Sequence, residues 1–258
     1  MSKIQHAFAN GKAFIAFVTA GDPSADKTVE FILAMAQAGA DLVEIGIPFS
    51  DPVAEGIVIQ QANERALKGG INTDKVFEIV SQVRAHSNVP LVFLTYINPV
   101  FHYGYERFFA KCEQLGVDGI IIPDLPYEEK AEIAAVAKAH GVDIISLIAP
   151  TSEERIAMIA REATGFVYVV SSMGVTGVRS QITTDLPGIV ATIKKVTDTP
   201  VAIGFGIHSP EQAAAMTEFS DGAIVGSAIV KIIAEHGAQA TQHLVEYVRD
   251  MKQAVAKA

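Results

Sequence analysis

The sequence predicts an α/β fold, a single (β/α)₈ TIM barrel that covers residues 1–258. Short apolar runs rich in β-branched residues alternate with helical patterns from one end of the chain to the other. Eight strand–helix units follow one another, and no linker-like segment divides them. A chain of 258 residues fits one large barrel or two small domains, and the unbroken alternation favours one barrel over an open doubly wound sheet.

The expected strands are apolar runs at 14–18, 42–47, 91–96, 119–122, 143–148, 166–170, 201–205 and 222–225. The expected helices carry apolar residues at helical spacing and include 24–38, 57–67, 74–85, 128–140 and 153–163. The predicted helix N-caps are Ser24, Thr73, Ser152 and Ser209. Glycine-containing turns at 39–41, 116–118 and 141–143 end a helix and begin the next strand.

Further elements are expected outside the regular units. An amphipathic segment at 2–10 is suited to plug the bottom of the barrel. The segment 57–67 is an extra helix in the loop after strand two, and another extra helix is expected after strand eight. A polar, Gly-rich connection at 171–186 is typical of a lid. Because loops after strands two and six share one barrel face, they are expected to meet over a substrate.

Composition narrows the class of protein. The net charge of −9 argues against a nucleic-acid or anionic-membrane surface. Charged residues make up only 19% of the chain, which indicates that a partner covers part of the surface. The single Cys112 excludes an internal disulfide and suits a reducing cytoplasm. Neither a signal-peptide pattern nor an apolar run of membrane-spanning length is found, so a soluble cytoplasmic protein is expected.

Two carboxylates mark the predicted active site. Glu44 is the only charged residue in the apolar run 42–47, where an unpaired ionised carboxylate is costly to bury. Glu55 lies on the loop that follows this strand, and the carboxyl ends of barrel strands are where such folds place their chemistry. We expect an acid/base pair in which burial raises the pKa of Glu44 while the more exposed Glu55 stays ionised. The alternative is that Glu44 belongs to a structural ion pair and Glu55 is a solvated loop residue.

Glycines near the end of the chain predict a phosphate site. Gly206 closes strand seven, and Gly226 and Ser227 follow strand eight and open a helix. Backbone amides of both loops, the Ser227 hydroxyl and the helix N-terminus can hold a phosphate without a basic side chain. The alternative is that these glycines only form tight turns. No dinucleotide fingerprint and no P-loop motif is present.

Aromatic residues at strand ends are candidates for an apolar substrate pocket. Tyr96 and Tyr168 are placed to pack on an aromatic ring, and Phe17 and Phe205 to wall it. Ordinary core packing is the alternative for each of them. The seven histidines show no ligand spacing, so no metal site is expected.

Together these residues resemble the tryptophan synthase α subunit family. The matching motifs run through nearly the whole chain in the family's order. They are FVTAGDP at 17–23, IPFSDP at 47–52 with an acid on the preceding strand, YINPVFHYG at 96–104, PDLP at 123–126, GVTG at 174–177, GFGI at 204–207 and GSAIV at 226–230. The IPFSDP block with the preceding acid is the most specific of these.

The resemblance implies a lyase that cleaves indole-3-glycerol phosphate in a retro-aldol reaction to indole and glyceraldehyde 3-phosphate. It implies no cofactor in this chain and a β subunit, in an α₂β₂ heterotetramer, that joins the indole to serine on pyridoxal phosphate to make L-tryptophan. The implied roles are acid/base for Glu44, cation stabilisation for Glu55, indole binding for Phe17, Tyr96, Tyr168 and Phe205, lid contacts for Thr176 and Gly177, phosphate binding for Gly206, Gly226 and Ser227, and the β-subunit interface for Pro48, Phe49, Asp51 and Pro52.

The chain departs from the family pattern at Glu55, where the family usually has aspartate. One extra methylene moves the carboxylate by roughly 1–1.5 Å, and a misplacement of about 1 Å can cost on the order of 10²-fold in rate. On this basis Glu55→Asp is expected to preserve or raise activity, unless the loop has been retuned around glutamate. Two other functions stay open: a stand-alone indole-glycerol phosphate lyase, and a degenerate α chain that mainly activates its β partner.

Overall fold

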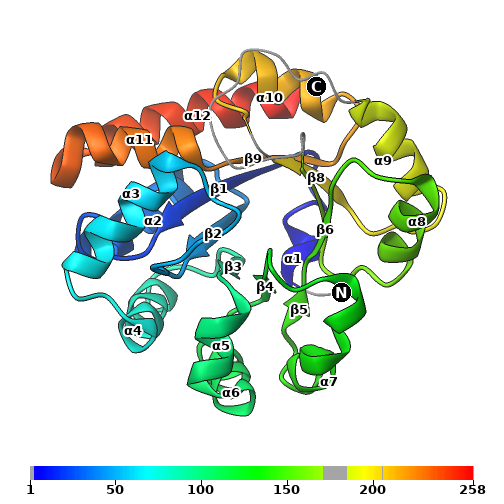
Figure 1. Ribbon diagram of the computed structural model, residues 1–258. Coiled ribbons are helices and arrows are strands. Elements are labelled where there is room, and N and C mark those ends of the chain that lie inside the picture. The colour runs from blue at the N-terminus through cyan, green and yellow to red at the C-terminus, as the bar shows by residue number, and fades with distance from the viewer. Residues whose placement is uncertain (1–2, 171–184, 205, 258) are drawn as a thin grey trace.

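The computed structural model describes residues 3–170, 185–204 and 206–257, which form a barrel of parallel strands surrounded by helices (Figure 1). The strands are β1 (Ala13–Thr19), β2 (Leu42–Gly46), β3 (Leu91–Leu94), β4 (Gly119–Ile121), β5 (Asp143–Ile144), β6 (Ser146–Ile148), β7 (Val167–Val170), β8 (Val201–Gly204) and β9 (Gly222–Val225). They are ordered β5-β4-β3-β2-β1-β9-β8-β7-β6. Since β5 and β6 are consecutive parts of one chain segment, the two ends of the sheet meet there. The predicted (β/α)₈ barrel is confirmed.

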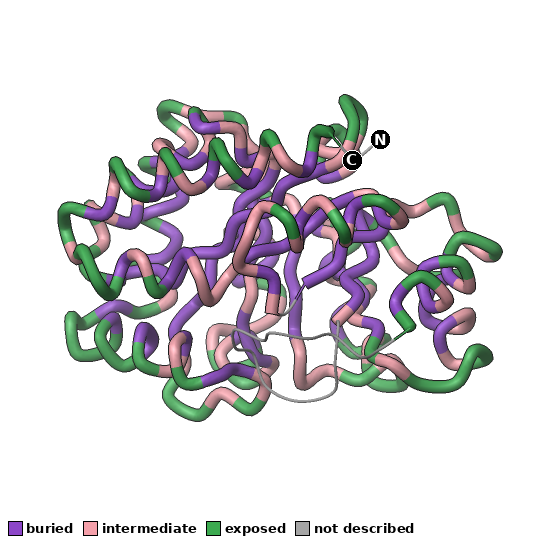
Figure 2. The backbone as a smooth tube through the Cα atoms, turned by 90° about the horizontal axis from the view of Figure 1, so that it is seen from above, coloured by how far each residue is buried: buried purple, intermediate pink, exposed green. Residues whose placement is uncertain are grey.

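The strands are apolar on both faces because each lies between the barrel interior and a layer of helices. All residues of β1 and β2 are buried. One cluster fills the barrel interior and includes Ile15, Leu42, Val92 and Tyr168. A second, larger cluster packs the outer strand faces against the helices. Figure 2 shows the buried backbone in the centre and the exposed positions on the outer turns of the helices.

Helices of the outer ring follow the strands in the chain. They are α2 (Ala25–Ala38), α4 (Thr73–Arg84), α6 (Tyr105–Leu115), α7 (Ala131–Ala139), α8 (Glu153–Arg161), α9 (Leu186–Lys194), α10 (Pro210–Thr217) and α12 (Thr241–Lys257). The predicted N-caps Ser24, Ser152 and Ser209 are confirmed, since each side chain accepts a hydrogen bond from a backbone N–H in the first turn. The prediction of Thr73 as a cap was wrong. Asn72 caps α4 instead, and its Oδ1 accepts from Lys75 N at 3.0 Å.

The helices expected outside the regular units are present. α1 (Lys3–His6) carries the fully buried Ile4 into the interior cluster, where Gly119 at the start of β4 leaves room for it. α3 (Ile57–Lys68) follows β2 and α11 (Ser227–His236) follows β9, as expected. None of the described helices is long and apolar enough to cross a membrane.

Three features were not predicted. An additional helix, α5 (Ile97–Tyr103), begins directly after Tyr96, so β3 ends at Leu94 and not at residue 96. Short 3₁₀ turns, η1 (Tyr127–Glu129) and η2 (Gly237–Gln239), precede α7 and α12. The strand expected at 143–148 is interrupted at Ile145, because β5 pairs with β4 whereas β6 pairs with β7. Most of the expected lid, 171–184, lies outside the described residues.

Candidate active site

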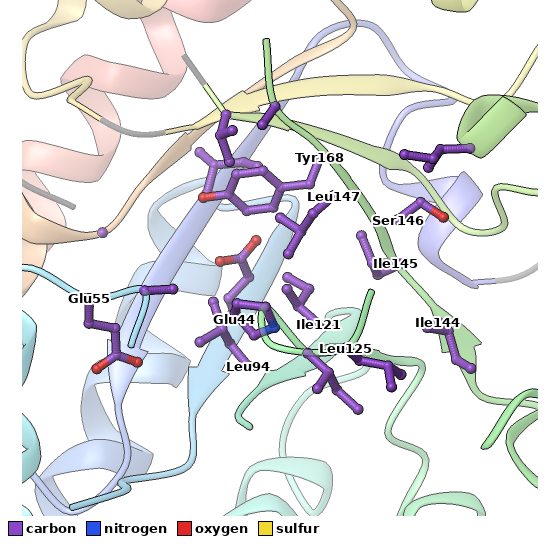
Figure 3. A pocket seen from close by; sticks show the side chains of 18 of the residues that line it. Glu44, Glu55, Leu94, Ile121, Leu125, Ile144, Ile145, Ser146, Leu147 and Tyr168 are labelled. Atoms are coloured by element: carbon purple, nitrogen blue, oxygen red, sulfur yellow. The ribbon is translucent and has the colours of Figure 1, made fainter. Parts of the chain in front are cut away.

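A cavity of about 620 Å³ opens at the carboxyl ends of the strands (Figure 3). The predicted site residues that line it are Phe17, Glu44, Glu55, Tyr168, Gly206, Gly226 and Ser227. They come from β1, β2, β7 and the loops after β2, β8 and β9, which are distant in the sequence and meet because the barrel closes. Thr176, Gly177 and Phe205, predicted to bind substrate, lie outside the described residues.

Glu44 is buried in the wall of this cavity. Its strand β2 is held on both sides, with Glu44 opposite Phe17 of β1 and Val92 of β3. The residue is 1% exposed, and its Oε1 has no hydrogen-bond partner within the part of the chain that the structure describes. Burial raises the pKa of Glu44 to about 8, so its carboxyl is protonated at neutral pH. A buried carboxyl without an ion-pair partner among the described residues does not fit the structural alternative.

Glu55 is not the exposed residue that the sequence indicated. It is 6% exposed, and Asn63 of α3 donates from Nδ2 to its Oε2 at 2.6 Å. Burial raises the pKa of Glu55 to about 7, while hydrogen bonds from Asn63 and Tyr96 act in the opposite direction. The alternative that Glu55 is a solvated loop residue was therefore wrong. Glu55 is more exposed than Glu44, as expected, but burial raises the pKa of both carboxyls. Its carboxylate points away from that of Glu44 in Figure 3, toward α3.

Asn63 was not predicted from the sequence as a site residue. It lies on the buried face of α3 beside Ile59, Ala62 and Ala66, where the helical pattern calls for an apolar side chain. A buried polar residue in such an apolar stripe needs a hydrogen-bond partner. This break in the apolar pattern is the signal that would have identified Asn63. Asn63 therefore connects the extra helix directly to the candidate site.

Tyr96 supports the loop and does not line the cavity. Its ring is 5.4 Å from that of Phe49, and its hydroxyl accepts a hydrogen bond from Ala54 N at 3.1 Å. The same hydroxyl is hydrogen-bonded to Glu55, and burial raises the pKa of Tyr96. Tyr96 thus holds the carboxylate of Glu55 in place from behind the cavity wall.

The predicted phosphate residues converge at one end of the cavity. Gly226 is the N-cap residue of α11 and Ser227 is its first residue, so the free amides of this ten-residue helix face the cavity. Gly206 lies in the neighbouring loop after β8 with φ of 86°, a conformation that favours glycine. The arrangement can bind an anion through backbone dipoles.

The ring of Phe17 fits inside the barrel because Gly46 has no side chain. A Cβ on Gly46 would lie 2.7 Å from Cζ of Phe17. We expect Gly46→Ala to lower the free energy of unfolding by about 1–3 kcal/mol, because the ring has to shift within a packed core. Urea denaturation measures this change. Gly226→Ala is the control, since its Cβ would meet Phe17 only at an ordinary 3.5 Å; equal stability of the two variants would contradict the packing argument.

Buried acids, an aromatic wall and a helix N-terminus around one cavity are features of a (β/α)₈-barrel enzyme. The chain belongs to the tryptophan synthase alpha chain family, whose model matches residues 4–256. It is 53% identical to the tryptophan synthase alpha chain of Lactiplantibacillus plantarum over 256 residues, covering 99% of this chain and 97% of that one. The relative from Lacticaseibacillus casei is 51% identical over 255 residues, covering 99% and 96%.

Solved structures agree with this assignment. The tryptophan synthase α₂β₂ complex of Pyrococcus furiosus contains a chain that is 37% identical, with a TM-score of 0.85 and coverage of 94% of this chain and 98% of that one. Within the described residues no group of three or more His, Cys, Asp or Glu side chains is placed to hold a metal ion.

Proposed function

We propose that this chain cleaves indole-3-glycerol phosphate to indole and glyceraldehyde 3-phosphate, and that it passes the indole to a β subunit for the synthesis of L-tryptophan. Family membership supports the reaction. The single observation that carries the mechanism is the buried, protonated Glu44, which lines the same cavity as the α11 N-terminus. A proton donor and an anion site in one apolar cavity suit a substrate with an aromatic ring at one end and a phosphate at the other.

In the proposed mechanism Glu44 acts first as a general acid. It donates its proton to C3 of the indole, and the resulting C3-protonated ring becomes an electron sink. The carbon–carbon bond then breaks, its electron pair enters the ring, and the glycerol hydroxyl becomes the aldehyde. The Glu44 carboxylate takes up the hydroxyl proton and is returned to its starting state. No cofactor bound by this chain takes part in these steps.

Glu55 stabilises the positive charge that develops on the indole ring. Hydrogen bonds from Asn63 and Tyr96 fix its carboxylate before the reaction begins, which is electrostatic preorganisation. Phe17 and Tyr168 form apolar walls beside the ring, and Gly206, Gly226 and Ser227 hold the phosphate. Thr176, Gly177 and Phe205 keep the roles that the family resemblance implies.

The loop after β2 provides a surface for the β subunit. Val53 of this loop is 70% exposed, Ile57 at the start of α3 is 65% exposed, and Phe101 of α5 is also 65% exposed. Large exposed apolar side chains of this kind mark interaction sites. Asp51 and Pro52 lie beside them, whereas the predicted interface residue Pro48 is buried and Phe49 packs on Tyr96. Pyridoxal phosphate belongs to the β subunit's reaction.

The reaction is tested by mixing the purified chain with indole-3-glycerol phosphate, with and without β subunit. Indole release that rises when β is added is the expected result. High turnover without any gain from β would identify a stand-alone lyase. No indole under either condition would leave only an activating role toward β.

The pH dependence of kcat/KM follows from the two carboxyl groups. The reaction needs protonated Glu44, whose pKa is about 8, and ionised Glu55, whose pKa is about 7. We expect a bell-shaped profile that falls below about pH 7 and above about pH 8. Indole release measured across this range checks it. A profile without an alkaline limb would contradict the role of Glu44 as proton donor.

We place the enzyme in the cytoplasm. Cys112 is buried and burial raises the pKa of its thiol, so the side chain is protected from disulfide exchange and suits a reducing compartment. Fractionation of cells that express the chain checks this location, and recovery in a secreted fraction would contradict it.

A further inference from the structure

The active-site cavity continues sideways through the barrel wall. Ile145 and Leu147 belong to the interior cluster, whereas Ile144 belongs to the outer cluster between sheet and helices. All three line the same cavity, and so does Arg155 of α8, which lies in the outer layer. In Figure 3 Ile145 and Leu147 point toward Glu44 and Tyr168, and Ile144 and Ser146 lie on the other side of the strand. The cavity therefore has an outer extension, here called the lateral arm.

The wall opens where the backbone ladder is interrupted. β4 and β5 are paired only through two positions, Gly119 with Asp143 and Ile120 with Ile144. Ile145 N donates to Ile120 O at 2.9 Å, and beyond it β6 is paired with β7. β5 and β6 are at opposite ends of the strand order, so the carboxyl end of β4 has no ladder to β6 among the described residues. This gap connects the interior to the space under α7 and α8.

The lateral arm combines apolar walls with positive charge. Ile122, Leu125, Ile144 and Ile159 give it apolar surface, and Ser146 adds a hydroxyl. The charged residues that line the arm are Lys130 and Arg155, whereas the acids lining the cavity, Glu44 and Glu55, are at the active-site end. The arm is thus suited to an apolar molecule that carries a negative group.

Lys130 is the cation of the arm that forms no ion pair among the described residues, although the carboxylates of Glu162 and Asp143 lie near it. Its Nζ donates to Glu162 O at a long 3.4 Å. Burial lowers the pKa of Lys130, and the nearby charges of Glu162 and Asp143 offset this only in part. Arg155 differs, because Glu128 already accepts two hydrogen bonds from its guanidinium at 2.7 and 3.1 Å. An anion beside Lys130 would replace the solvation that the ammonium has lost.

We propose that the lateral arm is a second binding site, for a small apolar monocarboxylate whose carboxylate pairs with Lys130 and whose hydrocarbon part lies between β4, β6 and α8. The site is separate from the phosphate-binding end of the cavity at Gly206, Gly226 and Ser227. It does not depend on the catalytic roles of Glu44 and Glu55.

Phenylacetate is the probe, and isothermal titration with the full chain measures its Kd in the presence of saturating inorganic phosphate. We expect binding under these conditions, and a Kd at least roughly tenfold higher for Lys130→Met, because a charge-assisted hydrogen bond is lost. Phenylacetamide, the neutral analogue, should bind the parent chain roughly tenfold more weakly than phenylacetate. Cleavage of indole-3-glycerol phosphate by Lys130→Met should stay within about twofold of the parent.

Lys138→Met is the matched control, since Lys138 is an exposed lysine of α7, the helix that begins directly after Lys130. It should leave the Kd of phenylacetate unchanged. The proposal would be overturned if phosphate displaced phenylacetate, or if the acid and the amide bound equally. Equal weakening by Lys130→Met and Lys138→Met would overturn it as well, because only the helix's overall charge would then matter. Loss of the lyase reaction in the parent chain would refute the proposed function without touching this site.

Discussion

Glu44→Gln is expected to lower the rate of indole formation by roughly 10²–10⁴-fold, the range that general acid–base groups contribute. Glutamine has the shape of glutamic acid, but its amide cannot deliver a proton to the ring carbon. The effect should fall on kcat, because Glu44 lies in the apolar wall and the phosphate is held elsewhere in the cavity. Inorganic phosphate should bind the variant within a few-fold of the parent. Steady-state assays of indole release measure kcat, and inhibition of the same reaction by inorganic phosphate measures the affinity for phosphate.

Glu64→Gln is the control for this change, since Glu64 is an exposed residue of α3. It should leave turnover unchanged.

Stability gives a second check. The folded-state pKa of Glu44 is raised to about 8 from 4.5, so its contribution to stability is full below about pH 4.5 and is lost as pH rises through about 8. Glu44→Gln should therefore be more stable than the parent above pH 8. A variant that keeps its turnover would remove Glu44 from the mechanism.

Glu55→Gln is expected to lower kcat by roughly 10²–10³-fold, the loss seen when a preorganised charge-stabilising group is removed. The amide oxygen can still accept the hydrogen bond from Asn63, so the loop should keep its conformation while the negative charge is lost. The acid limb of the pH profile should disappear in the same variant, because Glu55 is the group assigned to it. An acid limb that persists would assign that pKa to another group.

Glu55→Asp separates charge from position. The family pattern alone favours preserved or higher activity, but the contacts of Glu55 favour the opposite. Its Oε2 is 2.6 Å from Asn63 Nδ2, and a shorter side chain would withdraw the carboxylate by roughly 1–1.5 Å from this partner. We therefore expect a loss of about tenfold, smaller than that of Glu55→Gln. Turnover equal to or above the parent would show that the loop moves to compensate.

The parts of the fold that local sequence determines were predictable. Strands buried on both faces appear as apolar runs, and a carboxylate within one of them, Glu44, is conspicuous for the same reason. Caps such as Ser24 and Ser209 follow from hydrogen bonds within a single turn. The meeting of Gly206 with Gly226 could be predicted too, because neighbouring strands of a barrel end at the same face.

The parts that depend on distant partners were not predictable. Burial of Glu55 results from contacts with α3 and Tyr96, and a loop sequence alone does not reveal them. Tyr96 was expected in a substrate pocket. Its actual role could not be predicted, because it depends on where Phe49 and Ala54 fold back onto its ring and hydroxyl. The interruption at Ile145 is invisible in an apolar run, because both neighbouring strands attract the same residue types.

That interruption divides the backbone network into two continuous ladders, one from β1 to β5 and one from β6 to β9, which are joined directly through β1 and β9. On the opposite side the segment 143–148 is one continuous piece of chain, whose first part is bonded to β4 and whose second part is bonded to β7. Local opening there costs less free energy than elsewhere around the circumference, since fewer cooperative bonds have to break. The barrel therefore has a seam of low local stability around Ile145, where backbone amides are expected to exchange with solvent faster than those of β1 and β2.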